Sequence, residues 1–329
     1  MRTSTDVLGT DVLRLGTRRS ALAMAQSGMV ADQLRSRGRE VELVGVTTDG
    51  DRSARAGSPL ADAGGVGVFV TALRAQLLDG SVDLVVHSLK DLPTAPAEGL
   101  VIAAMPVRAD PRDALVARGG ARLADVPAGA RVGTGSPRRA AQLRAARPDL
   151  DVRPVRGNVD TRLGKVASGE LDAIVVAAAG LARLGRLSEA SELLDPGVML
   201  PAPGQGALAV ECRLAEGAGH RGGLGELYEL VAKLDDSPTR AAVVAERTVL
   251  AGLEAGCTAP VGALAELVGT RDLRLVAAVV SVDGSAAIRR SAIGPAADPE
   301  QLGRRLAADL LAAGADKLIG DRSVNGERP

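Results

Sequence analysis

The sequence predicts an α/β fold with largely parallel sheets, followed by a smaller α+β domain. Short apolar runs rich in β-branched residues alternate with helical patterns, and glycine or proline follows each helical pattern. The last third changes to antiparallel strands followed by an amphipathic helix. With 329 residues, the chain is too long for one ordinary core, which predicts two or three domains of roughly 100 to 150 residues each.

The first 180 residues carry the predicted α/β elements. The expected strands are residues 13–15, 41–48, 82–88, 101–107, 131–135 and 173–179. The expected helices are residues 21–37, 68–78, 138–146 and 159–168. Residues 49–67 are dense in Gly, Ser and Asp, which is typical of a long loop or lid.

Two stretches of these elements resemble each other. A strand runs into a glycine turn with hydroxyl and arginine residues and then into a helix at residues 13–20, and again at residues 131–139. Each turn aims hydroxyls, guanidinium groups and the N–H groups of a helix N-terminus at one point, which favours anion binding. Two such points would suit a clamp for a polyanionic ligand, although glycine turns and N-caps are common in α/β proteins.

The carboxyl-terminal third has its own pattern. Ser237 caps a helix that is expected to run to about Ala255, and strands are expected at residues 273–282 and 286–293. A helix at residues 299–313 completes a small α+β domain. Residues 216–225 are interpreted as an inserted surface loop, and the tail after Gly320 as loose.

Composition weighs against several classes of function. The formal net charge is zero, so no general field attracts nucleic acid or an anionic membrane, and one Phe, one Tyr and no Trp leave few stacking platforms for bases. Two cysteines cannot form a disulfide framework, and two histidines are too few for a common zinc site. The first 13 residues lack the apolar stretch of a secretory signal, so we expect a cytoplasmic protein. From the scarcity of histidine we expect no bound metal.

Lys90 and Asp91 follow the predicted strand 82–88 and precede Pro93. The carboxyl ends of strands line the ligand crevice in open α/β sheets. Adjacent side chains point in different directions, so one can hold an anion while the other meets a cation. The alternative is a pair of solvated loop charges.

A second candidate group consists of arginines. Its members are Arg138, Arg139, Arg156, Arg162 and Arg183. Guanidinium groups bind carboxylates bidentately and stay charged, so their convergence would indicate a ligand with several carboxylates. Since all but four of the 40 basic residues are arginine, base composition of the genome is an alternative explanation for any one of them.

The two cysteines differ in their surroundings. Cys212 lies in an apolar strand and is interpreted as a small buried hydrophobe, whereas Cys257 lies on a glycine-flanked turn after a helix. No histidine is near Cys257 in the sequence, so a Cys/His nucleophile pair is improbable there. Covalent attachment of a group is the better functional hypothesis for Cys257.

Seven segments together closely resemble the hydroxymethylbilane synthase (porphobilinogen deaminase) family. They are residues 15–20, 86–93, 132–139, 156–163, 172–185, 200–207 (LPAPGQGA) and 253–262. Each is a modest signal by itself, but all seven in order with compatible spacing are highly specific.

The resemblance implies a fold and a domain organisation. The fold would consist of two periplasmic-binding-protein-like doubly wound lobes plus a small α+β third domain. Domain 1 would comprise residues 1–108 with a return segment at 201–235, domain 2 residues 109–200, and domain 3 residues 236–329. Domain 3 would carry the cofactor.

The resemblance also implies a reaction. A dipyrromethane, fixed by a thioether to Cys257, would prime the transferase reaction, in which four porphobilinogen molecules condense head to tail with loss of ammonia. Hydroxymethylbilane, the linear tetrapyrrole of haem-type biosynthesis, would be the product. Each pyrrole ring carries about two carboxylates, so fixed arginines must neutralise the chain as it grows.

The resemblance assigns a role to each candidate residue. Asp91 would face the pyrrole nitrogens and stabilise the cationic centre left by loss of ammonia. The cofactor carboxylates would be held by Lys90, Thr134, Ser136, Arg138 and Arg139. The substrate and the growing chain would be bound by Arg18, Ser20, Arg156, Arg162 and Arg183.

The sequence departs from the family pattern in places. Val66 stands where many relatives have a lysine in the lid, which puts a lid contact in doubt, and Pro137 stands where a leucine is expected. A solute-binding receptor and a ligand-sensing transcription regulator are the alternative functions. The receptor would need an export signal and no third domain, and the regulator a helix-turn-helix module that the sequence lacks. Monomer is the default oligomeric state, since no exposed apolar stripe is evident.

Overall fold

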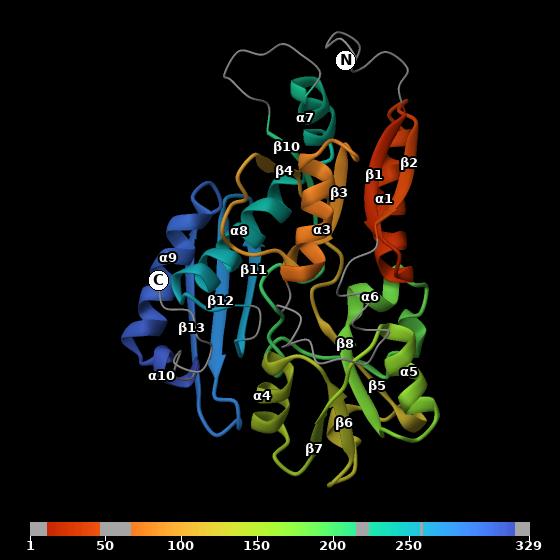
Figure 1. Cartoon of the computed structure of the whole chain (residues 1–329). Coiled ribbons are helices and arrows are strands. Elements are labelled where there is room, and N and C mark those ends of the chain that lie inside the picture. Colours follow the sequence, from red (N-terminus) through yellow and green to blue (C-terminus); the bar gives the residue numbers. More distant parts are fainter. Residues whose placement is uncertain (1–11, 47–66, 215–223, 257–258, 320–329) are drawn as a thin grey trace. The chain divides into compact units, whose positions relative to one another are not determined.

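The fold is described from a computed structural model of the chain, which describes residues 12–46, 67–214, 224–256 and 259–319 (Figure 1). Of the predicted loop at 49–67, residues 49–66, including Val66, lie outside these residues, and Gly67 begins a helix. Residue contacts divide the chain into two compact units. The first comprises residues 1–109, 182–185 and 206–240, and the second residues 110–181, 186–205 and 241–329. Within the described ranges, no helix combines the length and the hydropathy needed to cross a membrane.

The first unit contains a five-stranded sheet with the strand order β2-β1-β3-β10-β4. Its strands are β1 (Leu13–Arg18), β2 (Val41–Val46), β3 (Leu84–Ser88), β4 (Leu100–Ala104) and β10 (Leu208–Arg213). Only β10 runs antiparallel to its neighbours. Helices α1 (Ala21–Arg35) and α7 (Leu224–Ala232) pack on one face, and α3 (Gly67–Leu78) packs on the other. The sheet is therefore covered on both faces, as expected for a doubly wound lobe.

The second unit contains a sheet of the same design, with the strand order β7-β6-β8-β5-β9. Its strands are β5 (Asp113–Ala117), β6 (Arg131–Thr134), β7 (Asp151–Pro154), β8 (Ala173–Ala177) and β9 (Glu192–Leu193). Here β5 is the antiparallel strand. Helix α4 (Pro137–Ala146) covers one face, and α5 (Val159–Ala167) and α6 (Ala178–Arg183) cover the other.

The internal resemblance seen in the sequence corresponds to this repeated design. Arg14 at the start of β1 donates from its backbone N and its guanidinium to Asp83, the residue before β3. Arg131 at the start of β6 donates in the same way to Asp172, the residue before β8. One bidentate arginine–carboxylate pair thus fixes the same strand pair in each sheet.

A third, antiparallel sheet with the order β11-β12-β13 also lies in the second unit. Its strands are β11 (Val261–Val268), β12 (Asp272–Val280) and β13 (Ala287–Pro295). Helices α8 (Ser237–Gly252), α9 (Pro299–Ala312) and α10 (Ala315–Ile319) contribute to the aliphatic core on one of its faces (Figure 1). The predicted fold class, two doubly wound sheets and a small α+β body, is confirmed. The three-domain boundaries stay a prediction.

Candidate functional site

The predicted site residues of the first unit follow the carboxyl ends of β1 and β3. These strands are parallel neighbours, so their ends lie at one edge of the sheet. Arg18 ends β1, and the hydroxyl of Ser20 caps α1 by accepting a hydrogen bond from Ala23 N at 3.3 Å. The predicted helix start at Ala21 is thus confirmed, and the cap presents the helix N-terminus at the same edge as Arg18.

Lys90 and Asp91 lie in a single 3₁₀ turn, Leu89–Asp91, directly after β3. Leu89 is fully buried, and its N–H donates to the carbonyl of Ala207 at 3.0 Å, which fixes the start of the turn. Both charged side chains are only partly exposed. The structure therefore places Lys90 and Asp91 at the edge where Arg18 and Ser20 also lie.

Arg183 also belongs to the first unit, at the end of α6. Its Nη2 donates to the carbonyl of Gly206 at 2.6 Å, while its Nε is buried without a hydrogen-bond partner. Burial lowers the pKa of Arg183 to about 10. A guanidinium that still carries its charge at neutral pH and has an unpaired buried N–H is suited to an anionic ligand.

The predicted turn of the second unit connects β6 to α4. Thr134 is buried at the end of β6, and its Oγ1 accepts a hydrogen bond from Ser136 N at 3.2 Å. Ser136 caps α4, with Arg139 N as donor at 3.5 Å. A Cβ on Gly135 would lie 2.6 Å from the carbonyl oxygen of Val155, so only glycine fits between these two hydroxyl residues.

Arg138 and Arg139 are buried and share one carboxylate. Arg138 Nη1 lies 2.8 Å from Asp113 Oδ2, and Arg139 Nη2 lies 2.8 Å from Asp113 Oδ1. Gln205 Nε2 also donates to Asp113 Oδ1 at 2.8 Å. Arg138 Nη1 further donates to the carbonyl of Leu200 at 2.6 Å. Part of each guanidinium is therefore committed to the protein itself.

The charges of this cluster do not balance. Two guanidinium groups face one carboxylate, and Arg138 Nε is buried without a hydrogen-bond partner. Burial lowers the pKa of Arg138, against the opposing charge of Asp113. Burial by itself would raise the pKa of Asp113, but Arg138 and Arg139 outweigh it and hold that pKa below its usual value. The cluster thus keeps a surplus positive charge at the end of β6.

Arg156 and Arg162 flank the start of α5. Asn158 caps this helix by accepting from Thr161 N at 2.8 Å. Arg156 is exposed before the cap, whereas Arg162 is partly buried and its Nε has no hydrogen-bond partner. Burial, together with the nearby charge of Arg139, lowers the pKa of Arg162. The second unit therefore gathers Arg162 close to the paired arginines.

Of the two cysteines, Cys212 lies among the described residues. Cys257 lies outside the described residues, between the end of α8 at Gly252 and the start of β11 at Val261. Cys212 is 1% exposed in β10, and burial raises the pKa of its thiol to about 11. The interpretation of Cys212 as a buried hydrophobe is confirmed, and its thiol stays protonated at neutral pH.

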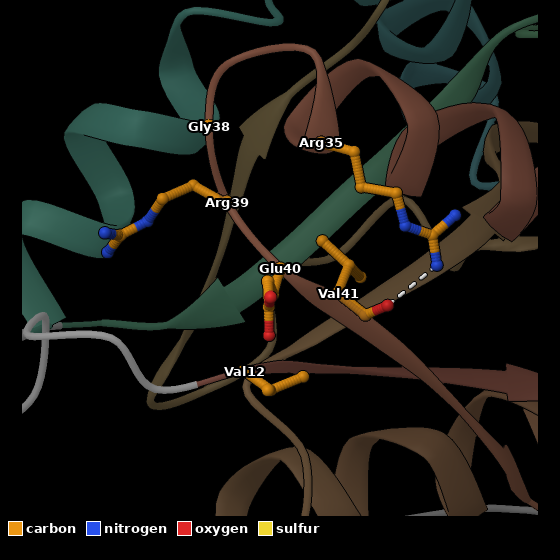
Figure 2. Close-up of a pocket in the computed structure, with 6 residues that line it drawn as sticks. All are labelled: Val12, Arg35, Gly38, Arg39, Glu40 and Val41. Atoms are coloured by element: carbon orange, nitrogen blue, oxygen red, sulfur yellow. Dashed lines mark hydrogen bonds between the residues drawn. The ribbon is translucent and has the colours of Figure 1, made fainter.

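A shallow depression of about 440 Å³ lies at the other end of the first sheet. It is lined by Val12, Arg35, Gly38, Arg39, Glu40 and Val41 (Figure 2). These residues lie around the amino ends of β1 and β2, and Arg35 Nη2 donates to the carbonyl of Val41 at 2.7 Å (Figure 2). None of the predicted site residues lines it. In the described part of the chain, no group of three His, Cys, Asp or Glu side chains is arranged to hold a metal ion.

Sequence reasoning missed the residues that hold the paired arginines. Asp113 and Gln205 are both fully buried, although Asp and Gln are usually exposed. Asp113 begins β5, a strand that the sequence did not predict. The sequence therefore did not indicate where the carboxylate of Asp113 lies. The one available signal was the position of Gln205 within the LPAPGQGA segment. That signal identifies the segment as part of the family pattern, but it does not indicate the contact of Gln205 with Asp113.

Comparisons with known proteins cover most of the chain. Residues 13–219 match the family described as "Porphobilinogen deaminase, dipyromethane cofactor binding domain", and residues 240–312 match "Porphobilinogen deaminase, C-terminal domain". The chain is 60% identical over 316 residues to the porphobilinogen deaminase of Acidothermus cellulolyticus, covering 96% of this chain and 93% of that one. It is 56% identical over 325 residues to that of Thermobifida fusca, covering 96% and 98%.

Solved structures share only a distant likeness. The VFT2 domain of Bordetella pertussis BvgS is 19% identical, with a TM-score of 0.38 over 68% of this chain and 86% of that chain. A putative methionine-binding lipoprotein of Bacillus subtilis is 11% identical, also with a TM-score of 0.38, over 68% and 91%.

Proposed function

This chain belongs to the porphobilinogen deaminase family, and from that membership we propose how its residues divide the work of the reaction. The protein is a transferase, the hydroxymethylbilane synthase of tetrapyrrole biosynthesis, with a dipyrromethane cofactor. Four porphobilinogen molecules condense head to tail with release of ammonia. What the sequence comparison leaves open is which side chain performs which step.

The surplus charge around Asp113 carries the proposal for cofactor binding. Arg138 and Arg139 exceed the charge of Asp113 by one, and Arg138 Nε has no hydrogen-bond partner among the described residues. A carboxylate of the dipyrromethane would balance that charge and satisfy that N–H. When bound, the cofactor supplies the pyrrole to which new units are joined.

We assign the cofactor carboxylates to five residues. They are Lys90, Thr134, Ser136, Arg138 and Arg139. Thr134 and Ser136 offer hydroxyls beside the N-terminus of α4, and that helix end favours negative charge. Arg138 and Arg139 would act with the parts of their guanidinium groups that Asp113 leaves unoccupied. They would therefore supply positive charge at fixed positions, without all of their N–H groups being available to the cofactor.

A second set of residues is assigned to binding the substrate and the growing pyrrole chain. It consists of Arg18, Ser20, Arg156, Arg162 and Arg183. Arg162 and Arg183 each have a buried Nε without a hydrogen-bond partner, which a substrate carboxylate would satisfy. Every added ring brings about two more carboxylates, so arginines at several separate positions can neutralise the growing chain better than a single binding pocket.

Asp91 is the proposed catalytic residue. Its position directly after β3 puts a carboxylate at the edge of the sheet next to Lys90. There it would face pyrrole nitrogens, stabilise positive charge as ammonia leaves and transfer protons at its carboxylate oxygens. Such assistance contributes about 10² to 10⁴ in rate.

Cys257 is the proposed attachment point, through a thioether. We further propose a cytoplasmic monomer in three domains, as expected from the sequence, with porphobilinogen as its small-molecule partner and neither nucleic acid nor a membrane as a partner. The zero net charge and the scarcity of aromatic residues support the absence of nucleic acid.

The test combines mass and turnover. The intact wild-type protein should weigh two pyrrole units more than its chain, and Cys257→Ala should lose that increment. Asp91→Asn should keep the fold and the increment but turn over porphobilinogen about 10² to 10⁴ times more slowly. Wild-type turnover by Asp91→Asn would remove Asp91 from its role, and an unchanged mass in Cys257→Ala would place the attachment elsewhere.

A further inference from the structure

Three polar side chains of the first unit, from an arginine, a glutamate and a histidine, meet on the face of the sheet that α3 covers. Arg74 of α3 donates to Glu211 of β10 from Nη2 at 2.8 Å and from Nε at 3.0 Å. His87 of β3 places its Nε2 3.3 Å from the second oxygen of Glu211. Glu211 and His87 are 2% and 6% exposed. Figure 1 shows α3 beside β3 and β10, the two strands that this cluster joins.

The carboxylate is the member on which the cluster depends. Burial by itself would raise the pKa of Glu211, but His87 and Arg74 beside it outweigh burial and lower that pKa overall. Glu211 therefore stays ionised, accepts both hydrogen bonds from Arg74 and lies within 3.3 Å of His87 Nε2. A bidentate arginine–carboxylate pair fixes the relative orientation of its two groups. When the pair is buried, losing one partner leaves a charge without compensation.

The cluster sits directly before the proposed catalytic turn. His87 precedes Lys90 by three residues and Asp91 by four, and Ser88 ends the strand between them. On the opposite face, Gln26 of α1 donates to the hydroxyl of Ser88 at 2.9 Å. Polar contacts thus hold the last two residues of β3 from both faces of the sheet.

We propose that Glu211 is a positioning residue for the reaction: by holding His87 against β10 and α3, it fixes the end of β3 and with it the orientation of Asp91. The proposal rests on the catalytic role assigned to Asp91. Only three residues separate His87 from Asp91, and the middle one, Leu89, is fixed by its N–H bond to the carbonyl of Ala207. Small displacements of a catalytic group are costly, and a shift of about 1 Å can lower a rate about 100-fold.

The experiment compares purified holoenzymes carrying the dipyrromethane. Glu211→Gln should lower kcat about 10- to 100-fold and leave KM for porphobilinogen within about twofold, because the substrate arginines are untouched. The mass increment of the cofactor should persist. Arg74→Gln, at a partly exposed side chain, is the milder variant that folds if Glu211→Gln does not, and its loss of kcat should be smaller but of the same kind.

A matched control lies on the same strand pair. Asp83 precedes β3 at its other end and binds Arg14 through a similar bidentate pair. Asp83→Asn should therefore reduce the melting temperature as Glu211→Gln does, while kcat stays at the wild-type value. A structural role for Glu211 would instead make the two variants alike in kcat.

A double-variant cycle separates this proposal from the role of Asp91. In an Asp91→Glu background, the effect of Glu211→Gln on kcat should shrink to about twofold or less, since the carboxylate it orients is already displaced. Full additivity, or a wild-type kcat in Glu211→Gln, would overturn the proposal. Wild-type turnover by Asp91→Asn would instead refute the assigned role of Asp91 and overturn this proposal with it.

Discussion

At the scale of single residues, the buried arginines perform two tasks at once. Arg138 and Arg139 hold the second unit together through Asp113, and the same groups are proposed to neutralise the cofactor. A surface arginine could bind a carboxylate more flexibly, but it would lose side-chain entropy on binding. Burial against Asp113 removes that freedom before the ligand arrives, which is preorganisation at the cost of a buried charge.

Asp113→Asn tests this arrangement. Without the carboxylate, two buried guanidinium groups face each other, so we expect the free energy of unfolding to fall by about 3 to 5 kcal/mol. Chemical denaturation at neutral pH measures the change. Asp172 pairs with Arg131 and is more exposed than Asp113, so Asp172→Asn should lower the free energy of unfolding by less. Equal losses in both variants would contradict the special position of Asp113.

The pH dependence of stability follows from the same carboxylate. The pKa of Asp113 is lower in the folded protein than in the unfolded chain, where it is about 3.9. Its contribution is therefore complete above that value and is lost as the pH falls through the folded-state pKa. Wild-type stability should decline below about pH 4 more steeply than that of Asp113→Asn. Parallel curves in urea titrations at pH 7 and pH 3 would refute this prediction.

At the scale of elements, glycine is required in the turn before α4 but not in the interior of α5. A Cβ at Gly135 would meet the carbonyl of Val155 at 2.6 Å, whereas Gly164 in the middle of α5 has open space around it. Gly135→Ala should therefore destabilise the protein by about 1 to 3 kcal/mol, and Gly164→Ala should stabilise it by about 0.5 to 1 kcal/mol. Melting temperatures of the two variants should move in opposite directions. A shift of the same sign in both would contradict the prediction.

The elements predicted from the sequence are those with clear periodicity and caps. Helix α1 begins at Ala21 and α9 at Pro299, as predicted, because Ser20 and Asp298 cap them. The predicted strand at 173–179 ends at Ala177, since the apolar run continues directly into α6 and hydrophobicity alone does not separate a strand from a buried helix.

Other elements gave no local signal. Strands β5 and β7 were not predicted, because β5 begins with the charged Asp113 and β7 is short and half exposed, with proline at its end. The sequence pattern indicated most candidate residues of the site, and the family resemblance gave them their roles. Their buried partners Asp113 and Gln205 depend on long-range contacts. Periodicity reports the faces of an element and not what lies across the core from it.

At the scale of the whole molecule, the second unit joins two sheets through residues 200–205. Ala263 N of β11 donates to the carbonyl of Pro201 at 2.9 Å, and a Cβ on Gly262 would lie 2.8 Å from the carbonyl of Leu200. On the other side, Arg138 and Gln142 bind the same Leu200. The segment therefore ties the proposed cofactor arginines to β11, the strand that follows Cys257 in the sequence.

Glu246 of α8 completes this connection, and it provides the last prediction. The side chain is fully buried, and its two oxygens accept from Gly204 N at 2.7 Å and from Ala265 N at 2.8 Å. Because one carboxylate serves amides from both segments, Glu246→Gln must leave one N–H facing an NH₂ group. The loss of a buried hydrogen bond to a charged group should cost about 1.5 to 3 kcal/mol.

Hydrogen exchange distinguishes a local loss from a loss of the connection. In the wild type, the Gly204 and Ala265 amides should open with similar free energies, and Glu246→Gln should accelerate both together. Glu266→Gln, at the exposed neighbour on β11, should change neither. Acceleration of one amide alone would mean that the two sheets of the second unit open independently, and that the position of the paired arginines is not coupled to β11 through this carboxylate.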